Sequence, residues 1–172
     1  YSCGQNPESG KVRMMLELPG SAESLMASFK SKLRSQVNKA VRDGLTSKLG
    51  GVEFFEDFYT IFSENMRELG SPVHSRSWLR NVLVHYGPRA KCGMVFMPDN
   101  RPAAAGIILC HQNIVSIPWA SSLRSFNRYN PNMLLYWSFL EFAADNGYRF
   151  FDFGRSTKGE GTYKFKAQWE AI

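Results

Sequence analysis

Hydrophobic residues recur at two spacings along this chain, and the change between them predicts the order of its elements. A strand-like run over residues 11–18 is followed, as far as residue 86, by apolar positions three or four residues apart, the spacing of helices. From residue 92 to residue 119, short apolar runs separated by turn residues take over. Helical spacing returns at residue 133. The pattern therefore predicts helices, an antiparallel sheet and a further helix, in that order.

Four helices are expected before residue 90, and glycine marks the end of three of them. The segments with helical spacing are 21–29, 31–44, 54–69 and 75–86. Ser21 is placed to cap the first helix through its hydroxyl group. The others end at Gly44, Gly70 and Gly87, where a helix commonly takes a left-handed residue.

The second half is expected to hold three hairpin-connected strands, a helix and two more strands. The first three strands are predicted over 92–97, 103–110 and 113–119, as an antiparallel meander. Asn130-Pro131-Asn132 is expected to cap a helix from residue 133 to about residue 146, which Gly147 ends. Strands over 148–153 and 162–169 complete the order.

The last of these segments alternates between apolar and polar side chains. As a strand, it would turn one face to the core and project the other outward. The outward face would carry Thr162, Lys164, Lys166 and Gln168. Two ammonium groups would then project together from a rigid element, shortly after Asp152 and Arg155, which flank Gly154.

Lysines fixed in this way suit acyl transfer, because the tetrahedral intermediate develops an oxyanion that positioned donors or cations stabilise. A lysine does this while protonated, whereas action as a general base requires strong burial to lower its pKa. Lys166 is therefore the candidate stabiliser, and the glycine-containing loop at 156–161 can bring backbone N–H groups near an anion. The alternative is an exposed edge strand, on which lysines discourage aggregation.

Composition places the chain among ordinary globular domains. Its 172 residues are 44% hydrophobic, which suffices for one domain with a packed core. The net charge is +6, and most of the excess lies between residues 30 and 48, where six lysines and arginines stand against Asp43 alone. This run is either a solvated helix face or a contact for a phosphate-bearing partner.

The cysteines, histidines and apolar runs argue against several kinds of site. Cys3, Cys92 and Cys110 are odd in number and far apart, and the three histidines are isolated, so we expect a reducing compartment and no metal. No run approaches the roughly 20 apolar residues of a membrane span, and no signal peptide is recognisable. We therefore expect a cytoplasmic protein. The first residue is Tyr1, which is consistent with a piece of a longer protein.

Four motifs, taken in order, resemble one known family. They are KSKLRSQVNKAVRDG at 30–44, IPWASS at 117–122, NPNMLLYW at 130–137 and FFDFGRSTKGEGTYKFKAQW at 150–169. Together they resemble the FemAB-like branch of the GNAT acyltransferase superfamily. The similarity is greatest to the FemAB-related bacterial proteins that accompany exopolysaccharide and PEP-CTERM protein-sorting systems. It spans residues 16–169.

The resemblance implies an α+β fold of α/β/α layers, in which a mixed, largely antiparallel sheet splays open and binds an acyl donor in the splay. Residues 1–172 would form a single GNAT-like domain, the C-terminal part of a longer FemAB-like protein that also has an N-terminal domain. Fem enzymes use two such domains and move amino acids from aminoacyl-tRNA to amines of peptidoglycan precursors. An amine-bearing small molecule or glycan precursor is therefore the implied acceptor.

Individual residues can be assigned to the site on the same basis. Lys166 matches the lysine that the family places near the acyl-transfer centre, with Tyr163 and Lys164 beside it. The residues expected to bind substrate are Trp119, Ser121, Ser122, Asp152 and Arg155. A phosphate-rich donor is expected to contact Arg34, Lys39 and Arg42.

One feature of acetyl-CoA-using GNAT enzymes does not appear in the sequence. They carry a Q/R-x-x-G-x-G/A loop before a helix, whose backbone N–H groups hold the pyrophosphate. The nearest string, RSTKGEG at 155–161, has one residue too many and precedes the predicted last strand. The donor, aminoacyl-tRNA or acyl-CoA, is therefore left open, and no tightly bound cofactor is expected.

Three functions remain as hypotheses. The first is transfer of an aminoacyl or acyl group by direct attack of the acceptor amine, because no Ser-His or Cys-His pair with motif support is visible. The second is an acetyl-CoA-dependent N-acetyltransferase with an unusual phosphate loop. The third is a catalytically silent GNAT-like module that binds nucleic acid or a carbohydrate-assembly partner.

Overall fold

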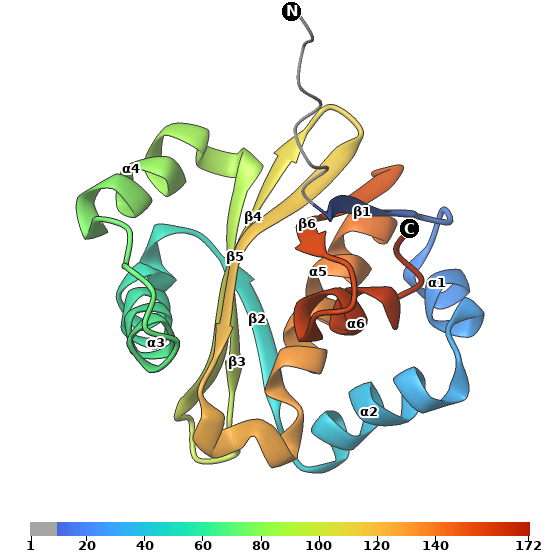
Figure 1. The fold of residues 1–172 in the computed structure, drawn as a ribbon, viewed down its shortest axis with the longest axis horizontal. Helices are drawn as coiled ribbons and strands as arrows, with labels where there is room; N and C mark the ends of the chain where they lie inside the picture. The colour runs from blue at the N-terminus through green and yellow to red at the C-terminus, as the bar shows by residue number, and fades with distance from the viewer. Residues whose placement is uncertain (1–9) are drawn as a thin grey trace, which may run out of the picture.

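A six-stranded mixed sheet forms the centre of the molecule, and the computed structural model describes residues 10–172 (Figure 1). The strand order across the sheet is β1-β6-β5-β4-β3-β2. The strands are β1 (Lys11–Glu17), β2 (Thr46–Gly50), β3 (Ala90–Phe96), β4 (Pro102–His111), β5 (Ile114–Ser122) and β6 (Phe150–Thr157). β5 and β6 run parallel, and the other four neighbouring pairs are antiparallel. The predicted meander is confirmed as β3-β4-β5.

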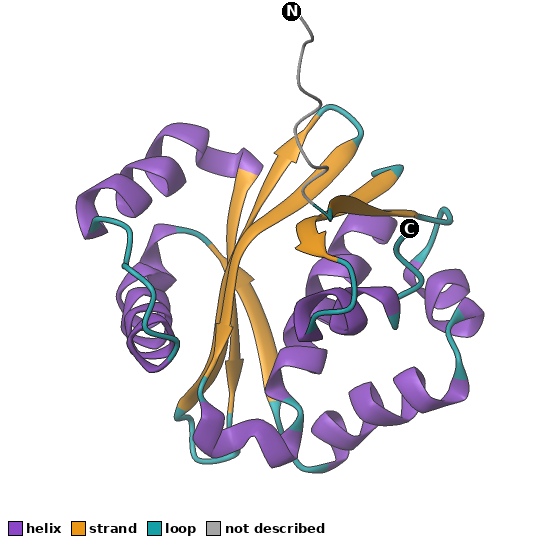
Figure 2. Ribbon diagram, viewed as in Figure 1, coloured by secondary structure: helices purple, strands orange, loops and turns teal. Residues whose placement is uncertain are grey.

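Helices cover both faces of the sheet and give three layers (Figure 2). One face carries α3 (Phe55–Glu68) and α4 (Arg76–Tyr86). The helices on the other side are α1 (Ala22–Ser28), α2 (Ser31–Arg42), α5 (Pro131–Asp145) and α6 (Gly161–Ala167). The expected α/β/α arrangement around a largely antiparallel sheet is therefore confirmed.

The helices of the first half begin and end where local signals place them. Ser21 Oγ accepts a hydrogen bond from the backbone N–H of Ser24, and Ser75 Oγ accepts one from that of Trp78, so both serines cap helices. Glycines with positive φ follow the next three helices, at +84° for Gly44, +65° for Gly70 and +53° for Gly87. The predicted ends of these helices are confirmed.

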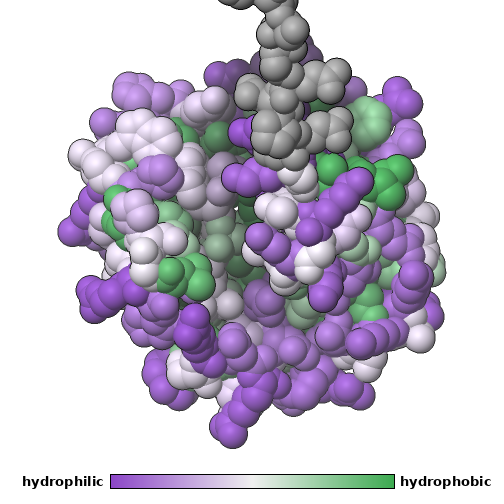
Figure 3. Space-filling view, in the orientation of Figure 1, coloured by the Kyte–Doolittle hydropathy of each residue, from purple (hydrophilic) through white to green (hydrophobic). Residues whose placement is uncertain are grey.

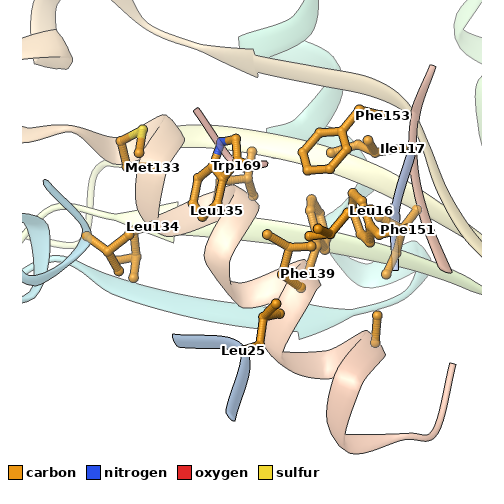
Figure 4. Packing of buried hydrophobic residues seen from close by; sticks show 14 of the residues in the cluster. Leu16, Leu25, Ile117, Met133, Leu134, Leu135, Phe139, Phe151, Phe153 and Trp169 are labelled. Atoms are coloured by element: carbon orange, nitrogen blue, oxygen red, sulfur yellow. The ribbon is translucent and has the colours of Figure 1, made fainter. Parts of the chain in front are cut away.

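Helix α5 packs across the sheet and is apolar on most of its sides (Figure 4). It begins at Pro131, and the expected side-chain cap is missing, because Asn130 takes a left-handed φ of 56° and its side chain makes no capping hydrogen bond. The ring of Phe139 reaches the sheet only because β3 and β4 carry glycines there. A Cβ added at Gly93 would lie 2.4 Å from Phe139 Cε1, and one at Gly106 would lie 3.1 Å from Cε2.

The chain ends in a helix, α6, so the prediction of a last strand over 162–169 is wrong. Over so short a segment, alternating apolar residues fit a helix as well as a strand. Trp169 lies in the turn that follows α6, and its ring packs against that of Phe165 on the helix, with centroids 6.4 Å apart. Trp169 is fully buried in the core around α5, and its packing stabilises the helical arrangement.

β5 and β6 pair over only three residues and then separate (Figure 1). Residues 114–116 of β5 lie opposite residues 150–152 of β6. Beyond this point β5 continues beside β4 as far as Ser122, while β6 continues beside β1 as far as Thr157. The sheet is therefore splayed in its middle, as the resemblance implied.

Candidate functional site

A pocket of about 160 Å³ lies against the part of β5 that has separated from β6. Figure 3 shows the surface hollowed between the side with α3 and α4 and the side with β6 and α6. Its walls come from α3, β5, α5 and α6 and include Asn65, Ser121, Ser122, Asn132, Tyr136 and Phe165. All the lining side chains are uncharged, so the pocket suits a small neutral group.

On the β5 side of the pocket, Ser121 and Asn65 form a polar pair. Ser121 is buried, and its Oγ accepts a hydrogen bond from Asn65 Nδ2 at 3.0 Å. The hydroxyl hydrogen of Ser121 and the amide oxygen of Asn65 are then free to meet a ligand. Ser121 and Ser122 line the pocket, and their role in substrate binding stays a prediction, whereas Asn65, which lies on α3, was not predicted.

The backbone of β5 also faces the splay. The N–H of Leu123 donates to the carbonyl of Ala103, so the hydrogen bonds of this part of β5 to β4 fall on alternate residues. By that alternation, the N–H and C=O groups of Ala120 and Ser122 point away from β4, toward the pocket that both residues line. This wall can therefore pair with an extended ligand through main-chain hydrogen bonds.

The splay has a second wall outside the pocket lining, formed by β6 and α6, and Lys166 lies on it. Its Nζ donates a hydrogen bond to the carbonyl oxygen of Arg155 at 3.2 Å. Burial lowers the pKa of the Lys166 ammonium group, and the nearby carboxylate of Asp152 acts in the opposite direction. Lys166 does not line the pocket. Its ammonium group lies against β6 close to Gly154, just beyond the last residue that pairs with β5.

Asp152 is the buried carboxylate of this wall, at the last residue that β6 pairs with β5. One oxygen accepts a hydrogen bond from the backbone N–H of Gly154 at 2.8 Å. The other accepts one from Nε of Arg13, on β1, at 3.0 Å, and the ion pair raises the pKa of that guanidinium group. Both oxygens thus have protein partners, which favours a structural role for Asp152 over direct contact with substrate.

Tyr136 supplies a phenol to the pocket and was not predicted. Burial raises its pKa to about 12, so the hydroxyl group stays protonated at neutral pH. Its ring packs edge-on against Phe165, with centroids 4.8 Å apart, and stacks on Phe153 at 5.9 Å. The apolar surroundings fix the ring between α5 and α6, where the phenol can act as a hydrogen-bond donor.

Lys164 and Tyr163 lie apart from Lys166. Two residues along a helix correspond to about 200° of rotation, so the predicted common face of Lys164 and Lys166 is wrong. Lys164 is exposed, and Tyr163 packs against the main hydrophobic core. Of the three predicted catalytic residues, only Lys166 has its charged group against β6 where β5 and β6 separate.

Trp119 and Arg155 were predicted to contact substrate, but neither of them lines the pocket. Trp119 contacts Trp78 on α4, with ring centroids 5.5 Å apart, and lies outside the pocket lining. The side chain of Arg155 is exposed, while its carbonyl group binds Lys166. Their predicted roles in substrate binding remain predictions.

The basic residues of α2 differ in whether their charges are paired with a carboxylate. Arg34 and Arg42 are exposed. Lys39 forms an ion pair with Asp43 and donates to the carbonyl of Arg128 at 3.0 Å. Because Asp43 offsets its charge, Lys39 is the weakest of the three candidates for a phosphate contact, and that contact stays a prediction for all three.

Cysteine and metal chemistry find no geometric support in the described residues. Cys92 and Cys110 are buried free thiols, and burial raises the pKa of Cys92 to about 12, which disfavours the reactive thiolate. Cys3 lies outside the described range. Within residues 10–172 no three His, Cys, Asp or Glu side chains are grouped to hold a metal ion. In the same range no helix combines the length and apolarity needed to cross a membrane.

The loop at 155–161 leads into a helix, where the sequence predicted a strand. Residues as far as Thr157 belong to β6, and the turn after them connects directly to α6. The spacing of the loop still has one residue more than the pyrophosphate-binding pattern. The loop therefore has the following helix that the pyrophosphate-binding pattern requires, but it does not have the required spacing.

Comparison with known proteins places the chain in a family. Residues 27–167 match the model of the acetyltransferase (GNAT) domain. No curated protein sequence matches the chain significantly.

Solved structures show the same fold at low sequence identity. The crystal structure of FemX superposes with a TM-score of 0.84 at 13% identity, covering 95% of this chain and 59% of that one. L-PGS from Bacillus licheniformis gives 0.65 at 12% identity, covering 93% and 56%. An aminoglycoside acetyltransferase from an uncultured soil metagenomic sample, in complex with sisomicin, gives 0.58 at 10% identity, covering 74% and 88%. The chain thus spans less than two thirds of the length of FemX and of L-PGS.

Proposed function

The chain belongs to the acetyltransferase (GNAT) domain family, and on that premise we propose that it transfers an aminoacyl or acyl group to an amine. The acceptor would be a peptidoglycan or polysaccharide precursor or a peptide, and its amine would attack the donor carbonyl directly. The observation that carries the proposal is the partly buried Lys166 ammonium group, which is held against β6 where the sheet splays.

Lys166 would act on the charge that develops during the reaction. The amine nitrogen bonds to the carbonyl carbon, and the carbonyl oxygen carries negative charge until the ester or thioester bond breaks. A fixed donor at such an oxygen changes kcat by about 10²–10³. Because Lys166 is partly buried, water screens its interaction with the oxyanion less than it would at an exposed lysine.

The proton lost by the amine would pass to the leaving oxygen or sulfur, directly or through water. Among residues 10–172, the pocket lining contains no carboxylate and no imidazole that could take it. Asp152 lies nearby, but both of its oxygens already accept hydrogen bonds. The leaving group is therefore the proton acceptor in this mechanism.

The β5 wall would bind the donor. The free backbone groups of Ala120 and Ser122 can pair with the arm that carries the acyl group, and the Asn65–Ser121 pair can hold its polar atoms. The uncharged walls and the volume of about 160 Å³ favour a small acyl or aminoacyl group over a long group with several charges.

We infer that the donor is aminoacyl-tRNA. The exposed arginines of α2 offer charge for a phosphate-rich molecule, and the loop at 155–161 lacks the pyrophosphate-binding spacing. The resemblance of the sequence motifs to Fem enzymes, which move amino acids from aminoacyl-tRNA, points to the same donor. The reaction would then take place in the bacterial cytoplasm, within exopolysaccharide or peptidoglycan assembly, and a second domain of a longer protein would help to bind the acceptor.

An acetyl-CoA-dependent N-acetyltransferase is the second candidate, because the matching family model describes acetyltransferases. A helix does come after the loop at 155–161, which this candidate requires. A catalytically silent module is the third, and it would bind tRNA with a steep salt dependence but no dependence on Lys166.

Calorimetric titration separates these candidates. The chain is titrated with acetyl-CoA, free CoA, aminoacyl-tRNA and deacylated tRNA. We expect saturable binding of aminoacyl-tRNA and none of acetyl-CoA. Micromolar binding of acetyl-CoA would instead establish the N-acetyltransferase. Binding of tRNA without any transfer to a simple amine, in wild type and Lys166→Ala alike, would favour the silent module.

A further inference from the structure

β6 contains a β-bulge where it leaves β5. Arg13 of β1 lies opposite Arg155, and Met15 lies opposite Asp152, so Met14 alone faces two residues of β6. One of those two is Gly154. Bulges bend a strand and re-aim its groups, and they are frequent beside active sites.

Gly154 determines the direction of this bulge. Its φ is +75°, which an L residue with a side chain rarely adopts. A Cβ added there would lie 3.9 Å from Lys166 Nζ, so the backbone passes close to the ammonium group. The next residue, Arg155, presents its carbonyl oxygen to the same Nζ at 3.2 Å.

Asp152 stabilises the bulge through hydrogen bonds to its buried carboxylate. One carboxylate oxygen accepts from the N–H of Gly154 at 2.8 Å, which fixes the turn, and the other accepts from Nε of Arg13 at 3.0 Å, which ties the turn to β1. Arg13 itself is largely exposed, whereas Asp152 is 5% exposed. A buried carboxylate with hydrogen bonds at both oxygens has one well-defined position.

We propose that Asp152 and Gly154 are positioning residues for Lys166. The carboxylate fixes the bulge, and the bulge presents the Arg155 carbonyl that holds the ammonium group where β5 and β6 separate. Neither residue touches the substrate. The inference rests on the proposed function for its kinetic consequence, but the arrangement itself can be tested without substrate.

The charged groups around Lys166 give the proposal a measurable consequence. Asp152 of β6 is the charged group that acts on Lys166, and Arg13 of β1 is paired with that carboxylate. The uncharged phenol of Tyr136, on α5, contacts α6 through Phe165. Burial lowers the pKa of Lys166, and Asp152 counteracts that shift. Neutralising Asp152 should therefore lower the pKa of Lys166 further, so that the ammonium group loses its proton at a lower pH.

Lysine-selective NMR titration of the chain measures this pKa in wild type and in Asp152→Asn. The asparagine oxygen can still accept from Gly154, so the fold should persist. The matched control is Glu17→Gln, which also removes a carboxylate paired with an arginine across β1 and β6, at the strand end near Arg149. We expect a lower Lys166 pKa in Asp152→Asn and no change in Glu17→Gln. Equal pKa values in all three proteins would overturn the proposal.

A second pair of variants tests the bulge without altering charge. Gly154→Ala and Gly147→Ala impose the same backbone strain, because φ is +75° and +77°, but Gly147 lies after α5, away from Lys166. We expect the Lys166 NMR signal to shift only in Gly154→Ala. Identical Lys166 signals in both variants would contradict a positioning role for the bulge.

Kinetics then separate this inference from the proposed function. If transfer occurs, Asp152→Asn should move the alkaline limb of its pH–rate profile to lower pH, while Glu17→Gln should leave it in place. A chain that shows the NMR shift but transfers nothing would leave the positioning intact and refute the acyl-transfer proposal. Transfer with an unmoved alkaline limb would refute the positioning alone.

Discussion

The two walls of the splayed sheet differ in the kind of group that each presents. The β5 wall presents neutral groups, namely a buried serine paired with an asparagine and the free edge of a strand. The β6 wall holds a buried carboxylate, an arginine from the neighbouring strand and a partly buried lysine. β5 and β6 pair with each other over three residues, and the two walls differ in the groups they present only beyond that pairing.

This difference suggests a division of labour between the walls. Neutral donors and acceptors bind a substrate about equally in its ground state and its transition state, which affects KM. A positioned cation interacts most strongly when negative charge develops, which affects kcat. Substitutions on the two walls should therefore have different kinetic signatures.

The largest effect is expected for Lys166→Met, on the β6 wall. Turnover should fall by about a hundredfold, because the oxyanion loses its cation. Lys164→Met removes the same charge from the exposed side of α6 and should change turnover by less than about twofold. Steady-state kinetics of the two variants provide the comparison, and equal losses would show that charge alone matters.

The β5 wall should show the next largest effect, in KM. Ser121→Ala and Asn65→Ala each remove a polar group that is proposed to contact the donor. One such hydrogen bond is worth about 1 kcal/mol, or roughly a fivefold rise in KM. Turnover should stay within about twofold of wild type. A large fall in kcat with unchanged KM would contradict the division between the walls.

Stability should respond to Lys166 in a pH-dependent way. Its folded pKa is lowered, so the unfolded chain binds the proton more tightly. The stability of wild type should therefore rise, relative to Lys166→Met, as the pH increases from the folded pKa toward the ordinary value of about 10.4. Urea unfolding at several alkaline pH values measures this difference, which should be small. A wild-type stability that falls relative to Lys166→Met over that range would contradict the lowered pKa.

The smallest effects are expected outside both walls, on α2. Arg42→Gln should reduce the slope of log binding constant against log salt for tRNA by about 1, the effect of one lost phosphate contact. Lys39→Gln should reduce it less, because Asp43 already offsets that charge. Neither substitution should alter turnover at saturating donor, and a loss of turnover would place α2 in the chemistry.

The fold was predictable wherever an element was long and had clear end signals. The stripe of α3 and the glycines after α2, α3 and α4 are local features, and the structure confirms them. α6 was mistaken for a strand because its apolar residues fit the period of a helix as well as that of a strand. Burial of Trp169 favours the helix. β2 was missed because TSKLG at Thr46–Gly50 lacks alternation and forms a strand only by pairing with β3.

The site was predictable where a motif was continuous in sequence. Lys166 and the serines of β5 come from such motifs, and the structure brings them to opposite sides of one splay. Asn65 meets Ser121 across 56 positions, and Arg13 meets Asp152 across 139. No local pattern encodes contacts of that range, because they depend on the order of strands in the sheet.

The central claim is that the β6 wall performs chemistry while the β5 wall binds. Single-turnover transfer from the donor that binds to a simple amine tests it most directly, with the donor dissociation constant measured for the same proteins. For Lys166→Met we predict a rate about a hundredfold lower at an unchanged dissociation constant, and for Ser121→Ala weaker binding at a nearly unchanged rate. An unchanged rate in Lys166→Met, or weaker binding as its main defect, would contradict the claim.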